Sequence, residues 1–142
     1  MGHVAGSELD GRTIPYDNSL DGLVSKKKDF IGKRSLSKTA YITKDSQKVV
    51  GVIPLDKKTS IPEGSYIVKD AKAKLPNPKL GHVSASCWSV EYDNPFSLAI
   101  IKDGKNMIGQ KLFALSPLKN KSIPVEIVSS HYVDPKGERV RS

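Results

Sequence analysis

The pattern of hydrophobic and polar positions changes near residue 48. From there to residue 128, short runs of β-branched and aliphatic residues alternate with Pro, Gly, Asn and Asp. This texture is typical of antiparallel strands joined by tight turns. The runs interpreted as strands are 49–53, 66–68, 81–88, 96–101, 112–115 and 123–128. Six strands at this spacing, with one short helix, predict a mostly-β fold: a closed or nearly closed antiparallel β-barrel of about six strands.

Two of these runs also predict which faces of their strands are buried. Residues 81–88 alternate between an apolar and a polar face, which is the period of a half-buried strand. Residues 96–101 are apolar on both faces, so we expect a central strand that is covered on both sides. The two runs are expected to pair through an intervening turn at residues 92–95.

The first part of the chain has a different texture. Residues 1–28 hold turn residues and too few spaced apolar residues to form a core face. Asp29 then precedes a run that predicts a short helix across residues 30–38, with Asp29 as its N-cap and Gly32 weakening it. We therefore divide the chain into an extended connector with a short helix over residues 1–46 and a barrel domain over residues 47–142.

Composition and sequence patterns predict the cellular compartment of the protein and the kinds of partner that it binds. Cys87 is the only cysteine, so no intrachain disulfide forms. No apolar run approaches the roughly 20 residues that span a bilayer, and no signal pattern begins the chain. These features predict a cytoplasmic protein without a membrane partner.

The net charge of +8 raises nucleic acid as a partner. The cations are spread along the chain, however, and only Lys26–Lys28 forms a run. Arginines are also few, so the sequence argues against nucleic-acid binding.

Side chains that could carry chemistry are sparse. His3, His82 and His131 lie far apart without metal-ligand spacing, and no G-x-G-x-x-G loop is present to hold a dinucleotide. Glu8 and Asp10 lie in turn-like surroundings and are interpreted as solvated loop carboxylates. We therefore predict no metal site, no flavin or nicotinamide site and no catalytic residue in this chain.

Three side chains near the end of the 81–88 run admit two interpretations each. Cys87 falls on the apolar face and is expected to be buried and unreactive, rather than a nucleophile. Trp88 and Tyr92 flank a turn, where they could form a shelf for a flat ligand or close one end of the barrel. We favour closure of the barrel.

Several motifs along the chain are similar to those of one enzyme family. Residues 24–36 (VSKKKDFIGKRSL) look like a K-D-F-I-G-K-x-x-L signature, residues 81–89 (GHVSASCWS) like a G-H-V-T-S-x-x-x-S strand, and residues 132–139 (YVDPKGER) like a Y-D-P-x-G-x-R ending. Together they resemble the C-terminal part of the aminomethyltransferase-like half of sarcosine oxidase α subunits. The related glycine-cleavage T-protein lacks this ending. Residues 89–95 depart from the S-P-T-L-G loop of the family.

The resemblance implies a barrel packed on a folate-binding domain, in an enzyme that oxidatively demethylates sarcosine and passes the one-carbon unit to tetrahydrofolate. It implies tetrahydrofolate at the edge of this domain, flavin and NAD sites on other domains or subunits, and the remaining α-subunit domains and the other subunits as partners. We expect this chain to be one part of that larger enzyme, to scaffold the folate site and to be inactive alone.

The resemblance also singles out one binding residue and leaves alternatives open. Arg139 is the positional match for an arginine that related T-proteins bring to folate, and a guanidinium can grip the glutamate tail of folate bidentately. Arg139 could equally be a solvated residue of a fraying tail. The alternatives for the whole chain are the barrel of a T-protein-like aminomethyltransferase and a free-standing basic binding module.

Overall fold

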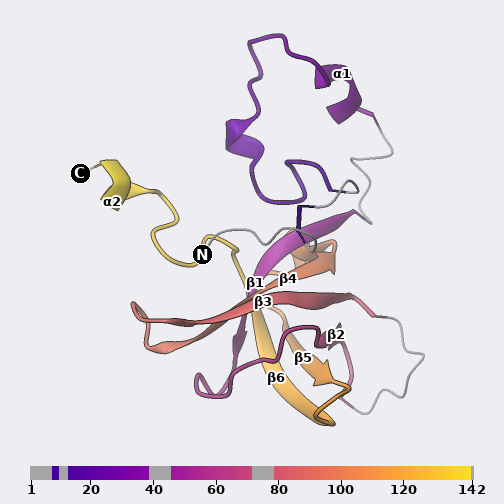
Figure 1. Cartoon of the computed structure of the whole chain (residues 1–142), viewed down its shortest axis with the longest axis vertical. Coiled ribbons are helices and arrows are strands. Elements are labelled where there is room, and N and C mark those ends of the chain that lie inside the picture. The colour runs from indigo at the N-terminus through magenta and orange to yellow at the C-terminus, as the bar shows by residue number, and fades with distance from the viewer. Residues whose placement is uncertain (1–7, 10–12, 39–45, 72–78, 142) are drawn as a thin grey trace.

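The computed structural model describes residues 8–9, 13–38, 46–71 and 79–141, and most of its regular structure is strand (Figure 1). The barrel strands lie between residues 47 and 128, and short helices lie on both sides of them. The elements are η1 (Asp21–Leu23), α1 (Lys33–Leu36), β1 (Gln47–Pro54), β2 (Tyr66–Val68), β3 (Gly81–Ser89), β4 (Asn94–Lys102), η3 (Gly104–Met107), β5 (Lys111–Ser116), β6 (Lys121–Val128) and α2 (Glu138–Arg141).

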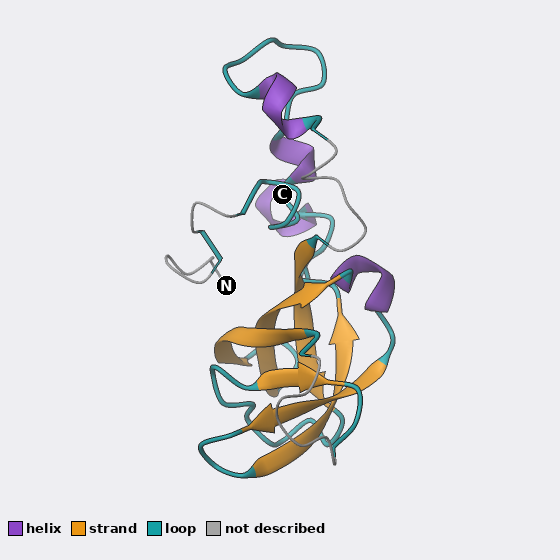
Figure 2. Cartoon of the chain, turned by 90° about the vertical axis from the view of Figure 1, so that its right-hand side faces the viewer, coloured by secondary structure: helices purple, strands orange, loops and turns teal. Residues whose placement is uncertain are grey.

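The six strands close into an antiparallel barrel in the order β1-β4-β3-β2-β5-β6. Figure 2 shows the strands gathered at one end of the chain's fold, with the connector and its helices beyond them. β1 completes the ring because it pairs with β4 along one side and with β6 along the other, so that Val52 lies opposite both Ser97 and Ile127. Closure pairs each of the six strands with two neighbours. The predicted fold class is confirmed, and each of the six predicted strands is present.

Alternating residues of the strands fill the barrel. In β6, Ile123, Val125 and Ile127 are buried while the intervening positions are more exposed. β4 is buried on both faces because a second apolar cluster covers its outer side. The prediction of a central strand covered on both sides is therefore confirmed. The members of the interior cluster are Val50, Val52, Ile61, Ile67, Val83, Ala99, Ile101, Leu112, Ala114, Ile123, Val125 and Ile127.

A β-bulge in β3 changes which side chains face the interior. Val83 pairs with Ala99 of the interior cluster, but the register then shifts and Ala85 pairs with Leu98, which belongs to the outer cluster. Directly paired residues share a face of the sheet, so the extra residue turns the rest of β3 over. Cys87 pairs with Phe96 on the outer side and is exposed. The prediction that Cys87 is buried was wrong for this reason.

The exposed thiol carries a direct prediction. We expect Cys87 of the native protein to react with an alkylating reagent at neutral pH without prior unfolding, because the residue is exposed. Mass spectrometry of samples quenched over time measures the rate. Cys87→Ser is the control for off-target labelling. Modification only after unfolding would contradict the outward orientation of Cys87.

The helix predicted across residues 30–38 is shorter and begins differently. A turn brings the amide of Lys33 to the carbonyl of Phe30 (3.2 Å), with Gly32 at φ 94°, and α1 follows as a single turn. Gly32 is the N-cap residue and no side chain caps the helix, so the prediction of an Asp29 cap was wrong. The turn separates Asp29 from the amide groups that it was expected to accept. None of the helices in the described ranges is long and apolar enough to cross a bilayer.

Candidate functional site

A cavity of about 1230 Å³ lies between the connector and the side of the barrel where β1 begins. Most of its lining comes from connector residues between Tyr16 and Ser37. Ser46, the last connector residue, also lines it, and the barrel contributes Lys48 in β1 and Lys105 in η3. Figure 1 shows the connector rising from the barrel as an open loop that carries α1. Two parts of the chain thus form the site together.

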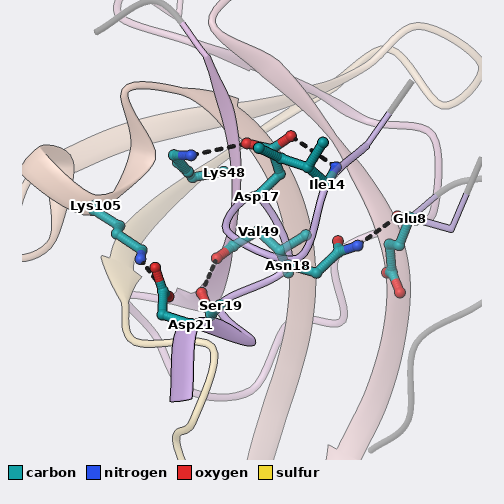
Figure 3. Close-up of polar contacts among 9 residues, drawn as sticks. All are labelled: Glu8, Ile14, Asp17, Asn18, Ser19, Asp21, Lys48, Val49 and Lys105. Atoms are coloured by element: carbon teal, nitrogen blue, oxygen red, sulfur yellow. Dashed lines mark hydrogen bonds and ion pairs between the residues drawn. The ribbon is translucent and has the colours of Figure 1, made fainter. Parts of the chain in front are cut away.

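Ion pairs and backbone contacts hold the base of the connector on the barrel (Figure 3). Lys48 Nζ lies 2.8 Å from Asp17 Oδ1, and the amide of Val49 donates to the carbonyl of Asp17 over 2.7 Å. Lys105 Nζ lies 2.8 Å from Asp21 Oδ2. Partial burial raises the pKa of Asp21, but the hydrogen bond and charge of Lys105 outweigh it, so the pKa lies below its ordinary value of 3.8. The two barrel lysines at the cavity are therefore neutralised within the chain.

Glu8 is a further anchor that the sequence did not reveal. Its carbonyl accepts hydrogen bonds from Thr13 Oγ1 (2.9 Å) and Asn18 Nδ2 (3.0 Å). Its side-chain carboxyl group accepts a hydrogen bond from Ser84, the extra residue of the β3 bulge. Glu8 is fully buried. The interpretation of Glu8 as a solvated loop carboxylate was therefore wrong, and Asp10 lies outside the described residues.

The opposite wall of the cavity is basic and partly apolar. Lys33 Nζ donates to the carbonyl oxygens of Lys28 (2.7 Å) and Lys26 (3.4 Å), which folds the lysine run around the cavity. Among the described residues, no carboxylate forms an ion pair with Lys26, Lys27 or Lys28. Val24, Phe30 and Leu36 also line the cavity and give it apolar surface. The cavity therefore suits a partner that is both anionic and partly apolar.

Arg139 does not belong to this cavity lining. It lies in α2, and its guanidinium binds Glu91 bidentately, with Nη1–Oε2 at 3.0 Å and Nη2–Oε1 at 2.6 Å. The arm that carries it is fixed by Tyr132, whose ring stacks on Phe96 with centroids 5.1 Å apart and also meets Tyr92 at 4.6 Å. The C-terminal arm thus lies against the β3–β4 hairpin. A folate role for Arg139 stays a prediction.

The aromatic residues at the hairpin do not close the barrel. Trp88 is 51% exposed and Tyr92 is 48% exposed, because β3 and β4 extend beyond the barrel as a two-stranded ribbon (Figure 1). The expectation that they close one barrel end was wrong. Tyr92 instead contacts the C-terminal arm through Tyr132.

The Glu91–Arg139 pair should make docking of the arm pH-dependent. The hydrogen bond and charge of Arg139 lower the pKa of Glu91 below its ordinary value of 4.5. A carboxylate with a lowered pKa contributes stability above its unfolded pKa and loses it as pH falls through the folded value. Separate NMR signals of the Arg139 guanidinium protons are therefore expected near pH 6 and should disappear under more acidic conditions. Glu91→Gln should lack them throughout, and titration of Glu91 above pH 4.5 would contradict the pairing.

The described residues offer little catalytic or metal-binding chemistry. Within the described ranges, no group of three or more His, Cys, Asp or Glu side chains could hold a metal ion. The charged contacts around the cavity and the arm instead position segments of the chain.

Known proteins resemble this chain in fold and in sequence. No protein-family model matches the sequence. The crystal structure of glycine cleavage system aminomethyltransferase T from Bartonella henselae superposes with a TM-score of 0.66, at 20% identity, over 87% of this chain and 33% of that chain. At this identity the likeness concerns the fold alone. The chain thus shares the fold of the matching part of that aminomethyltransferase.

Sequence relatives of the chain include sarcosine oxidase α subunits. The sarcosine oxidase α subunit of Rhizobium meliloti (strain 1021) is 34% identical over 141 residues, which cover 98% of this chain. The corresponding subunits of Corynebacterium strains P-1 and U-96 are 33% and 34% identical over 138 residues, or 96% of the chain. The chain is homologous to one segment of sarcosine oxidase α subunits, as its motifs predicted. It spans about 14% of the length of these relatives.

Proposed function

We propose that this chain serves as the barrel domain of a sarcosine oxidase that couples the oxidative demethylation of sarcosine to tetrahydrofolate. The supporting observation is the match to three sarcosine oxidase α subunits along almost the whole chain. In this role residues 47–142 form the barrel and residues 1–46 connect it to a folate-binding domain. The barrel scaffolds the folate site, contributes no catalytic group and is inactive alone.

In this proposal, the redox cofactors are bound by other parts of the enzyme. Flavin and NAD bind other domains or subunits, and the enzyme works in the cytoplasm. Its partners are the remaining domains of the α subunit and the other subunits, with neither membrane nor nucleic acid involved. A T-protein-like aminomethyltransferase is not favoured, because the solved T-protein structure shares only 20% identity while the sarcosine oxidase subunits share 33–34%. A free-standing basic module is not favoured by these relatives either.

Tetrahydrofolate is placed at the edge of the barrel, with Arg139 as the residue that holds its glutamate carboxylate. The fit is supported by Glu91, whose carboxylate already occupies both Nη atoms of Arg139. The guanidinium is therefore oriented for a carboxylate, and the folate tail would have to replace Glu91 there. Bound tetrahydrofolate would supply the one-carbon acceptor, while Arg139 binds and orients its tail.

A chimeric enzyme tests the proposed function. This chain replaces its matched segment in the Rhizobium meliloti α subunit, and sarcosine-dependent oxygen consumption is compared with that of the unmodified enzyme. We expect activity in the chimera and none in the isolated chain. Loss of activity in a folded, flavin-loaded chimera would contradict the assignment, and sarcosine oxidation by the isolated chain would contradict its inactivity.

The role of Arg139 is tested in the same chimera. Arg139→Ala should raise the tetrahydrofolate concentration needed for one-carbon transfer by about tenfold or more, the scale of a lost charge-assisted hydrogen bond. Sarcosine oxidation itself should be unchanged. Arg141→Ala is the matched control, because Arg141 is an exposed arginine of the same helix. Equal behaviour of the two variants would overturn the folate role of Arg139.

A further inference from the structure

The described connector segment from residue 20 to residue 38 contains no fully buried residue. Neither η1 nor α1 contains a buried residue, and Leu23 and Ile31 are 80% and 104% exposed. A helix of one turn is not stable by its own hydrogen bonds, since helical stability in proteins comes mainly from packing of an apolar face. The segment from residue 20 to residue 38 therefore presents apolar side chains that are suited to packing against another surface.

The same segment carries unbalanced charge. Lys48 and Lys105 at the cavity are paired with Asp17 and Asp21. The run Lys26–Lys28 forms no ion pair with a described carboxylate, although its three ammonium groups line one cavity. Like charges held close together repel, and carboxylates brought among them would relieve that repulsion. The partner suited to this face is acidic.

The size of the cavity indicates that its partner is a protein surface and not a small anion. The cavity of about 1230 Å³ exceeds the roughly 300–1,000 Å³ typical of small-molecule pockets. Leu23 and Ile31 are neighbours in the chain of the lining residues Gly22, Val24 and Phe30 but do not line the cavity themselves, so the exposed apolar surface of this segment is not confined to the cavity. Exposed apolar patches bordered by polar residues mark protein–protein contacts. A small anion inside the cavity would leave these two side chains in water.

We propose that the lysine-rimmed cavity, together with Leu23 and Ile31, is the docking surface for an acidic and partly apolar protein surface supplied by polypeptide outside residues 1–142. This inference rests on the proposed function, because it takes the partner to be another part of the same enzyme. The apolar side chains of the connector pack against the centre of that surface. Carboxylates around the centre pair with Lys26, Lys27 and Lys28.

The chimeric α subunit permits a direct test with an amine-reactive reagent. Modification of each lysine is measured by mass spectrometry in the isolated chain and in the chimera. We expect at least about fivefold slower modification of Lys26–Lys28 in the chimera, the scale of one kcal/mol of protection. Lys119 and Lys121, exposed at the β5–β6 turn, are the controls and should be unchanged. Equal reactivity of Lys26–Lys28 in the two samples would overturn the docking surface.

Zero-length cross-linking with a carbodiimide identifies the partner chemistry. It should join Lys26, Lys27 or Lys28 to Asp or Glu residues that lie outside the 142-residue segment. If tetrahydrofolate alone protects these lysines in the isolated chain, and the chimera yields no such cross-link, the cavity is a small-anion site and the proposal fails.

Hydrogen exchange in the isolated chain gives a measurement that does not depend on the chimera. Amides of residues 20–38 should exchange much faster than those of β1 and β4. If residues 20–38 are as well protected as these strands, the segment is stable without a partner and the docking proposal is overturned. The two proposals fail separately: an active chimera with reactive lysines overturns only the docking surface, and a cross-linked but inactive chimera overturns only the proposed function.

Discussion

The Gly81→Ala variant is expected to lose about 3 kcal/mol or more of its free energy of unfolding, at the upper end of the range for overpacked sites. A Cβ at residue 81 would lie 1.9 Å from the carbonyl oxygen of Ile100 and 2.8 Å from Cα of Ile101. Both are backbone atoms of β4 and cannot rotate away. Gly81 also pairs with Ile67 of β2, so a shift in either direction disturbs a second strand.

Gly22→Ala is the matched control for this experiment. A Cβ at Gly22 meets nothing within 4 Å, and its φ does not lie in the left-handed region. The substitution is expected to change stability by less than about 1 kcal/mol and to act mainly on the unfolded chain. Urea denaturation followed by circular dichroism gives both values. A Gly81→Ala variant as stable as Gly22→Ala would contradict the close approach of β3 and β4.

Ile101→Ala is expected to be the most damaging truncation in the barrel interior, at about 2–5 kcal/mol. Ile101 has no exposed surface and belongs to the interior cluster, where it lies opposite Gly81 of β3 and Lys48 of β1. Removing its three outer carbons leaves a cavity that the closed ring of strands cannot collapse to fill. A loss of this size is a large part of the 5–15 kcal/mol typical of a domain.

Two further substitutions separate this cavity effect from a general loss of hydrophobic surface. Ile101→Val removes one methylene and should cost about 0.5–1.5 kcal/mol. Leu118→Ala removes an exposed side chain in the β5–β6 turn and should change stability by no more than about 0.5 kcal/mol. Similar losses for Ile101→Ala and Leu118→Ala in chemical denaturation would show that Ile101 does not pack in the core.

Most strand positions were predictable because strand formation leaves a local pattern. The alternation in β6 and the doubly apolar run in β4 are readable over six to nine residues and were located within two residues of their ends. The resemblance in motifs was also readable, because it needs only the order of residues along the chain. Neither inference requires knowledge of which segments meet in space.

Of the errors at Cys87, Glu8 and Asp29, the first two arose from contacts between residues far apart in the chain, and the third arose from a local turn. The alternation of residues 81–88 was read correctly up to Val83, but the bulge at Ser84 depends on how β3 pairs with β4, so the exposure of Cys87 was missed. Glu8 was misread because its partner Ser84 lies 76 residues further along the chain. Asp29 looked like a helix cap because a cap motif does not show that Gly32 will form a turn first.

The amino-acid sequence by itself determined which segments become strands, which turns separate them and which enzyme family they resemble, because each of these is recorded in neighbouring residues. Only the tertiary structure decided the ring order β1-β4-β3-β2-β5-β6, the outward face of Cys87 and the cavity that the connector encloses with β1 and η3. These features depend on contacts between residues far apart in the chain. Their free energy comes from the assembled barrel and leaves no periodic trace in any single segment.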